Sequence, residues 1–290
     1  MLIDVHAHIG RLGTERSEAL DVNDLVNKMD IWGIDKSCVH CLSEHPEAHY
    51  LESDTEDIIA GCSKYPDRLI PFCLVDPRFG LNSPDMDFSY LLEEYVARGC
   101  KGMGEMLPKM YFDDPRCLNL FRQVGEFGLP IIFDMNDSAS YYGLRDDYGL
   151  PRLEKALQEC PDTVLVGHGP TFWAEISKDV PENQRAGYPT GPVVPGGAVP
   201  RLMEKYDNLW ADLSAGSGYN GVTRDEKFGL EFLGQFQDKL MFGTDSCSRY
   251  AKGAEAEIVD LMKRLREEQL LSEEACEKIA SGNAIRLMDL

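Results

Sequence analysis

Short apolar runs alternate with amphipathic stretches along the whole chain, and this alternation predicts eight strand–helix units. Runs rich in Val, Ile, Leu and Phe are typical of buried parallel strands. The predicted strands are Leu2–Ile9, Lys36–Leu42, Leu69–Val75, Lys101–Leu107, Pro130–Asp134, Thr163–His168, Asn208–Leu213 and Lys239–Asp245. The predicted helices lie near Val22–Trp32, Thr55–Tyr65, Phe88–Ala97, Pro115–Phe127, Pro151–Glu159, Ala198–Lys205, Asp225–Phe236 and Ala254–Glu267. Strands that alternate with helices form a parallel sheet, and eight units close a (β/α)8 barrel.

Two segments depart from this alternation. Residues 170–197 separate the sixth strand from the next helix and contain five prolines and four glycines. A connection of this length is commonly a lid or a binding loop. Its aromatic residues Phe172, Trp173 and Tyr188 favour an ordered lid over the end of the barrel. At the other departure, Ser272 and the acidic residues after it begin an extra C-terminal helix. Without repeats or a low-complexity segment, residues 1–290 are predicted to be one domain.

Composition agrees with a single globular barrel. The chain has 290 residues, 43% hydrophobic and 27% charged, which is enough apolar material for a sizeable core. It carries 29 basic and 50 acidic residues, a formal charge of −21. Such a surface serves solubility, and it also repels phosphate backbones and anionic lipids. We therefore expect a small-molecule substrate and neither nucleic acid nor membrane as a partner, and we leave homo-oligomerisation open.

The cysteines and the N-terminus point to a cytoplasmic protein. Nine cysteines are scattered without a repeated spacing, several of them in apolar runs, as is typical of reduced, buried thiols. Cys38 and Cys41 have the spacing of a redox or zinc pair, but they would face opposite sides of a strand. The first residues form no signal peptide, and no segment has the ~20 apolar residues that would cross a membrane.

The first predicted strand ends in two histidines. His6 and His8 are two residues apart, so on a strand they share a face and both imidazoles can reach one ion. A histidine pair with this spacing is common by chance. Its place at the end of an apolar first strand favours metal binding, because barrel enzymes carry their catalytic groups where the strands end.

Four other predicted strands also end in groups that can bind a metal. Glu105 ends the fourth strand, Asp134 the fifth, His168 the sixth and Asp245 the eighth. Taken singly, a strand-end Asp often caps a helix and a lone His often only packs. Together with the first-strand histidines, these four residues predict a metal site at one rim, with His6, His8, Glu105, Asp134, His168 and Asp245 as the candidate ligands.

Mixed nitrogen and oxygen ligands favour a divalent metal. Zn²⁺ is our first choice, and Mn²⁺, Fe²⁺ and Ni²⁺ also suit such ligands. A bound ion would lower the pKa of its water from ~15.7 to about 7. We expect the Asp245 carboxylate to accept the proton of that water, and His168 to polarise the substrate carbonyl.

Four motifs in this order carry a resemblance to a known family. They are Ile3-Asp4-Val5-His6-Ala7-His8, Val166-Gly167-His168-Gly169-Pro170, Phe242-Gly243-Thr244-Asp245 and the tail Gly282-Asn283-Ala284-Ile285-Arg286-Leu287. The chain resembles the amidohydrolase superfamily, and within it amidohydrolase family 2. The resemblance implies a (β/α)8 barrel, a divalent metal on the first-strand histidines and the eighth-strand Asp, and attack by activated water. The tail motif would belong to folding.

The chain departs from this family at two places. Relatives of the decarboxylase type commonly end the fifth strand in a metal-binding His, where this chain has Asp134. Two-metal relatives often carry a carboxylated Lys on the fourth strand, where this chain has Glu105, as TatD-like nucleases do. The number of ions, one or two, stays open. The charge of −21 argues against a nucleic-acid substrate, so the likeness to these nucleases is applied to the ligand Glu105 and not to the substrate.

The leading hypothesis is hydrolysis of an amide, lactone or ester in a small, carboxylated metabolite. Trp173 in the lid, Tyr219 after the seventh strand and Arg249 after the eighth are the candidate substrate contacts. One alternative is metal-dependent non-oxidative decarboxylation, which the absent fifth-strand His opposes. Another is a barrel that binds a ligand without catalysis.

Overall fold

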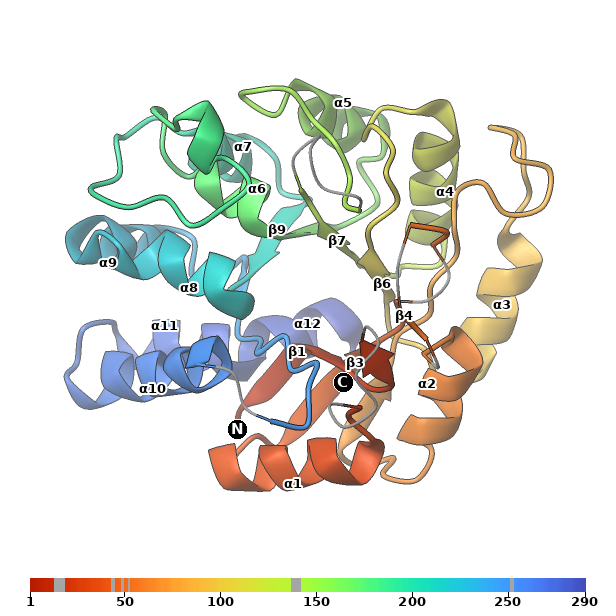
Figure 1. Cartoon of the computed structure of the whole chain (residues 1–290), viewed down its shortest axis with the longest axis horizontal. Helices are drawn as coiled ribbons and strands as arrows, with labels where there is room; N and C mark the ends of the chain where they lie inside the picture. Colours follow the sequence, from red (N-terminus) through yellow and green to blue (C-terminus); the bar gives the residue numbers. More distant parts are fainter. Residues whose placement is uncertain (13–18, 43–44, 48–49, 52, 137–141, 251–252) are drawn as a thin grey trace.

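The computed structural model describes residues 1–12, 19–42, 45–47, 50–51, 53–136, 142–250 and 253–290, and it has the predicted (β/α)8 barrel (Figure 1). The barrel strands are β1 Ile3–His8, β3 Lys36–His40, β5 Leu69–Pro71, β6 Met103–Met106, β7 Ile131–Asp134, β8 Leu165–His168, β9 Leu209–Asp212 and β10 Leu240–Met241. All neighbouring strands pair in parallel, within one sheet of order β1-β3-β5 and one of order β10-β9-β8-β7-β6.

Backbone hydrogen bonds join the two sheets at both seams. Between β5 and β6, Cys73 donates to the Gly102 carbonyl at 3.0 Å and accepts from Gly104 at 2.9 Å. Between β10 and β1, Val5 donates to Phe242 at 3.0 Å and Asp245 donates to His6 at 2.7 Å. The eight strands therefore form a closed ring, in which all carboxyl ends meet at one rim.

The helices surround this ring and lie close to the predicted ranges (Figure 1). They are α1 Val22–Trp32, α2 Thr55–Cys62, α3 Ser89–Ala97, α4 Pro115–Glu126, α5 Pro151–Glu159, α6 Pro170–Ala174, α7 Ala198–Lys205, α8 Ala215–Thr223, α9 Glu226–Gln235, α10 Gly253–Glu267, α11 Glu273–Glu277 and α12 Asn283–Met288. Side-chain caps explain several starts: Asp21 accepts from two backbone N–H groups of α1, and Asp54 forms a capping box on α2.

The structure differs from the prediction in several places. The eighth strand is paired with β9 only over Leu240–Met241, because the chain beyond it pairs with β1 instead. The seventh unit carries two helices, α8 and α9, where one was expected. The predicted lid contains α6 and the short 3-10 helix η2 Glu182–Gln184, and a π-helical turn, η3 Lys278–Gly282, joins α11 to α12. The small antiparallel pair β2 Arg11–Leu12 and β4 Tyr50–Leu51 was not expected.

Two apolar clusters stabilise the barrel. The larger lies between the strands and the outer helices. The smaller fills the lower barrel with inward-facing residues such as Val5, Phe72 and Val166, and α12 packs against it through Ala284 and Met288. Asn283, at the start of α12, donates to the carbonyls of Gln237 and Leu240, both at 2.7 Å. The tail motif therefore closes the amino end of the barrel and leaves the carboxyl end open for chemistry.

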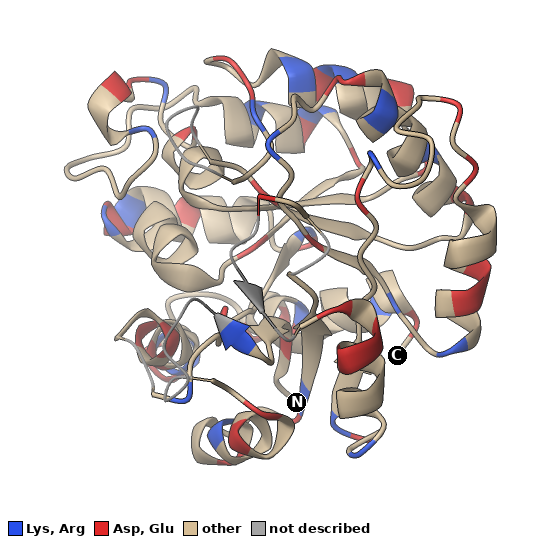
Figure 2. Cartoon of the chain, turned by 45° about the vertical axis from the view of Figure 1, so that its right-hand side comes forward, with Lys and Arg blue, Asp and Glu red and all other residues tan. Residues whose placement is uncertain are grey.

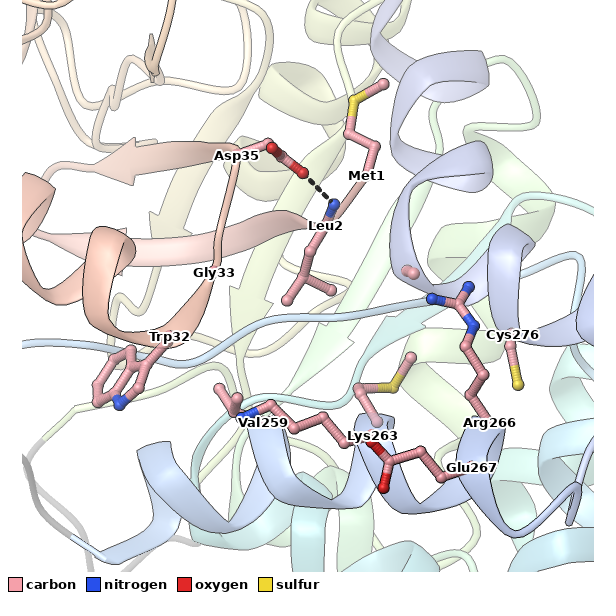
Figure 3. Close-up of a pocket in the computed structure, with 12 residues that line it drawn as sticks. Met1, Leu2, Trp32, Gly33, Asp35, Val259, Lys263, Arg266, Glu267 and Cys276 are labelled. Carbon is pink, nitrogen blue, oxygen red and sulfur yellow. Dashed lines mark hydrogen bonds between the residues drawn. The ribbon is translucent and has the colours of Figure 1, made fainter.

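A cavity of about 390 Å³ lies at the amino end of the barrel, between the end of α1 and α10 (Figure 3). Met1, Leu2 and Trp32 line it from one side and Val259 and Met262 from the other. It is on the opposite end of the barrel from the strand-end residues singled out above, so it does not belong to the candidate site.

The surface shows acidic and basic residues side by side on the outer helices (Figure 2). Pairs such as Arg98 with Glu56 and Arg122 with Glu159 lie on this surface. Exposed pairs of this kind contribute little to stability. Within the described ranges, none of the helices combines the length and the apolar character that a membrane span requires.

Candidate metal centre

Two imidazoles from β1 point at one place at the carboxyl end of the barrel. His6 and His8 are both buried, and their Nε2 atoms lie 3.1 Å apart. They converge because residues two apart on an extended strand share a face. Two carboxylates join them. Glu105 Oε2 lies 3.6 Å from both Nε2 atoms, and Asp245 Oδ1 lies 3.2 Å from His8 Nε2 and 3.9 Å from His6 Nε2.

Asp245 reaches this place through its backbone conformation. It has a φ of 57°, in the left-handed region that few L-residues other than Asn and Asp tolerate. Its N–H donates to the His6 carbonyl, so the residue is fixed directly beside β1. The Asp245 side chain remains 26% exposed, whereas Glu105 is buried. Asp245 is therefore the carboxylate of the group that faces the mouth of the barrel.

A second group of ligand atoms shares Glu105. His168 Nε2 lies 3.7 Å from Glu105 Oε1, the oxygen that does not face the β1 histidines. Glu105, Asp134 and His168 form a set whose ligand atoms lie within 4.8 Å of one another, as His6, His8 and Glu105 do. Asp134 Oδ1 is buried and has no hydrogen-bond partner in the described part of the chain. A buried carboxylate oxygen without a donor is a group that a cation would satisfy.

Gly169 lets the turn after β8 pass close to Asp134. Its φ is 98°, and a Cβ there would lie 2.7 Å from the Met135 carbonyl oxygen and 3.0 Å from Asp134 Oδ1. Any side chain would therefore displace the backbone or the carboxylate. This explains why the glycine follows His168 in the sixth-strand motif.

Asp212, which the sequence analysis did not single out, connects the two groups. His6 Nδ1 lies 2.9 Å from Asp212 Oδ2, and His168 Nδ1 lies 3.0 Å from Asp212 Oδ1. Ser214 donates to Asp212 Oδ1 at 2.5 Å. Because an ionised carboxylate can only accept, both Nδ1 atoms must carry a proton, which leaves both Nε2 lone pairs for a metal. Asp212 ends β9, so the rule that located the other strand-end residues would also have found it.

Charges within the cluster shift the pKa values strongly. Burial opposes the charged form of His6, but Asp212 and Glu105 raise its pKa well above the usual range. Burial also opposes the charged form of His168, but Asp212 raises the His168 pKa to about 9. Burial and the neighbouring Glu105 raise the pKa of Asp134 well above its usual range. Without a cation the cluster therefore holds extra protons, which a bound metal would displace.

His40 is a further buried imidazole that the sequence analysis passed over. It lies on β3, with its ring centroid 4.8 Å from that of His6 and 4.3 Å from that of Phe72. Its Nε2 donates to the Val5 carbonyl at 2.8 Å, and its Nδ1 has no partner among the described residues. Burial and the nearby His6 lower its pKa well below the usual value, so His40 packs as a neutral ring beneath the centre.

Two buried charged residues hold the chain that carries Asp245. Asp4 accepts from the Thr244 N–H at 2.9 Å and from the Thr244 hydroxyl at 2.7 Å. Lys28 on α1 donates to Ser246 Oγ at 2.8 Å and pairs with Glu255 at 2.8 Å. These contacts fix the residues on both sides of Asp245, which supports a precise ligand position.

The structure places the three predicted substrate contacts in different surroundings. Trp173 is 1% exposed and packs in the core against Phe172 and Phe232, so it cannot close over a ligand. Tyr219, on α8, packs against the same core and is partly buried. Arg249, after β10, pairs with Asp24 of α1 at 2.8 Å.

The predicted lid lies on the carboxyl face of the barrel, the same side as the metal ligands. Arg185 donates to the Asp146 and Asp147 carbonyls of the loop after β7, at 3.1 and 3.0 Å. It also pairs with Glu175 at 2.8 Å. This segment therefore bridges the loops that follow β7 and β8.

Comparison with known proteins agrees with this fold. An amidohydrolase family model matches residues 44–290. Among curated proteins, no sequence matches the chain. The solved structures include an uncharacterised TIM-barrel protein from Bordetella bronchiseptica, with a TM-score of 0.65, 16% identity and 99% of each chain covered.

Two further solved structures carry names of reactions. A probable 2-pyrone-4,6-dicarboxylic acid hydrolase from Acinetobacter baumannii has a TM-score of 0.61 at 15% identity, over 100% of this chain and 99% of that one. A 5-carboxyvanillate decarboxylase from Sphingomonas paucimobilis has a TM-score of 0.60 at 13% identity, with the same coverage. At these identities the likeness shows the shared barrel. The family model covers most of the chain, and we conclude that this protein belongs to the amidohydrolase family.

Proposed function

We propose that this protein is a metal-dependent hydrolase that cleaves an amide, lactone or ester bond of a small, carboxylated metabolite. One observation carries the proposal: His6, His8, Glu105 and Asp245 converge at the open end of the barrel, beside an Asp134 oxygen that has no partner among the described residues. Hydrolases that activate water on a metal need about three protein ligands and an open position, and the exposed side of Asp245 provides that access.

The donor set fits one divalent ion and has room for a second. His6, His8, Glu105 and Asp245 would hold the first ion. The second set, Glu105, Asp134 and His168, would hold another, with one Glu105 oxygen directed at each set. Imidazole and carboxylate ligands suit Zn²⁺ first, then Mn²⁺, Fe²⁺ or Ni²⁺.

When bound, a divalent ion would supply a water with a pKa near 7. Asp245 is positioned to accept the proton of that water, because its carboxylate faces the mouth. Although burial opposes it, the contact with His8 and the charge of His6 lower the Asp245 pKa, so the group is ionised at neutral pH. It could then return the proton to the leaving group.

His168 has two roles that exclude each other. With one ion, His168 keeps the proton that its pKa of about 9 implies, and its Nε2–H can donate to the developing oxyanion. With two ions, His168 Nε2 must be deprotonated to act as a ligand, and Asp134 becomes a ligand beside it. The number of ions therefore decides how the substrate carbonyl is polarised.

Metal analysis and a substrate panel test the proposal together. We expect protein purified without added metal or chelator to contain one or two equivalents of a first-row divalent metal. Asp134→Ala should reduce two equivalents to one, and should leave a single equivalent unchanged. Lactones and N-acyl amino acids form the panel, and the oxygen of ¹⁸O-labelled water should enter the product. Wild-type protein without stoichiometric metal would contradict the proposal.

Non-oxidative decarboxylation is the second candidate, since a decarboxylase is among the similar structures. That likeness concerns the fold alone. Release of CO2 from an aromatic carboxylate, without label from ¹⁸O-water in the product, would favour it. A ligand-binding barrel without catalysis, the third candidate, would bind ligands without turning over any member of the panel.

A further inference from the structure

Tyr188, in the lid, contacts the segment that follows β9 at the carboxyl end of the barrel. It is 57% exposed, and its ring lies against Gly216 at the start of α8. A Cβ on Gly216 would lie 3.2 Å from both Tyr188 Cζ and Tyr188 Oη. Gly216 follows Ser214, the residue that bonds to Asp212. The Tyr188 hydroxyl therefore lies at the start of α8, a few residues beyond Asp212, the carboxylate that joins the two ligand groups.

Hydrogen bonds on both sides of Tyr188 fix this position. Before it, the buried Arg185 connects the segment to Glu175 and to the loop after β7. After it, Arg224, directly after the C-terminal end of α8, donates to the Pro189 carbonyl at 3.5 Å. Farther on, the Val193 N–H donates to Asp225 at 3.0 Å. The lid is thus anchored over β7, β8 and α9, with Tyr188 between the anchors.

The surroundings of Tyr188 connect it to the metal ligands. Burial comes first among the causes that raise its pKa, and the charges of Asp245 and Asp134 follow. Asp134 ends β7, Gly216 lies beyond β9, and Asp245 lies beyond β10. A side chain that contacts Gly216 therefore lies on the carboxyl face of the barrel, beside the strand end that carries Asp212.

We propose that Tyr188 is the substrate-contacting residue of the lid: its ring covers the metal centre, and its hydroxyl donates to a carbonyl or carboxylate oxygen of the bound substrate. This inference rests on the proposed function, because the proposed function supplies the carboxylated substrate that Tyr188 would contact. A phenol suits this place, because it is a rigid, neutral donor beside several carboxylates. Gly216 provides the space in which the ring lies.

Two probes test the ring and the hydroxyl separately on zinc-loaded protein. The ring is tested with 4-(2-pyridylazo)resorcinol, a coloured chelator that must enter the mouth to remove zinc. Tyr188→Ala should release zinc severalfold faster than wild type, and Tyr188→Phe should not. The hydroxyl is tested with benzoate by calorimetry. Tyr188→Phe should weaken benzoate binding roughly 10-fold, as expected for the loss of a hydrogen bond to a charged oxygen.

The matched controls are Tyr90→Ala and Tyr90→Phe, since Tyr90 is a comparably exposed tyrosine, 53%, on α3. Both should behave as wild type. Gly216→Ala provides an independent variant, because its methyl group would push the ring and should also speed zinc release. A wild-type rate of zinc release from Tyr188→Ala would overturn the proposal that the ring covers the metal centre. A wild-type benzoate affinity in Tyr188→Phe, or no saturable benzoate binding by wild type, overturns the hydrogen bond. Failure of the proposed function looks different: the wild-type protein would then bind no zinc, or would hydrolyse no member of the substrate panel, whatever the Tyr188 variants show.

Discussion

Replacing Asp212 by Asn is the sharpest test of how this centre is built. Each Asp212 oxygen accepts from one imidazole, at 2.9 Å from His6 and 3.0 Å from His168. An Asn side chain has the same shape but offers one acceptor and one donor. Only one histidine can then keep its proton on Nδ1. The other must turn over its tautomer, and the Nε2–H that results cannot bind a metal.

The size of the effect follows from this geometry. Loss of one partner behind a ligand typically costs 10–100-fold in metal affinity, or about 1.4–2.7 kcal/mol. Because two imidazoles share this carboxylate, we expect Asp212→Asn near the upper end, about 100-fold. Asp212 is fully buried, so the mismatched contact should also lower the free energy of unfolding of the metal-free protein by about 1–3 kcal/mol.

Competition with a chromogenic chelator measures the zinc affinity, and urea unfolding measures the stability of the metal-free protein. Asp114→Asn is the control, because the Asp114 carboxylate also accepts from an N–H group, that of Arg116 at the start of α4, but lies away from the metal centre. Ser214→Ala should have a smaller effect in the same direction, since it removes one donor from Asp212. An Asp212→Asn protein with wild-type zinc affinity would refute the shared-carboxylate argument.

Three further predictions concern the ligands and the rim. His6→Ala and His8→Ala should each lower metal content and activity together while the circular dichroism spectrum is retained, and a double variant that keeps one ion per chain would contradict the ligand assignment. Asp245→Asn should keep most of the metal and lower turnover by roughly 10²–10⁴; normal turnover with a lowered melting temperature would leave only a structural role. Asp76 accepts from Arg78 and from a buried His45, which together hold its pKa well below 3.8 against the effect of burial. Asp76→Asn should therefore cost about 1.5–3 kcal/mol of stability at pH 7, a difference that shrinks below pH 4 in urea unfolding curves; a difference that does not vary with pH would count against it.

The barrel could be predicted because its strands are nearly continuous apolar runs, which only a parallel sheet covered on both sides requires. The boundaries of strands and helices could be predicted less accurately from the sequence. The predicted eighth strand continued through Phe242 to Asp245, but there the backbone makes only isolated hydrogen bonds to β1 and turns at Asp245. The additional helix of the seventh unit, α8, is rich in glycine, so its composition did not predict a helix.

The metal ligands could be predicted because strand ends of a barrel all meet at one rim. Asp212 satisfied the same rule, yet a single Asp among strand-end residues does not reveal that it will face two histidines. That depends on the register between β8 and β9, which places Gly167 opposite Ala211. Register is a property of the assembled sheet, and local sequence does not encode it.

The lid shows where sequence reasoning stops. Trp173 and Tyr188 are both aromatic residues of the same connection, and Trp173 is the one that lies closer to His168 in the sequence. The turn at Gly169 starts α6 immediately, and the helix directs Trp173 onto Phe172 and Phe232 in the core. Tyr188 lies in irregular chain between Arg185 and Pro189, whose hydrogen-bond partners Asp146 and Arg224 come from distant parts of the sequence. The buried aromatic holds the lid to the barrel, and the exposed one is left to meet the ligand. Distance along the chain from a metal ligand is thus a poor guide to substrate contact when a helix intervenes.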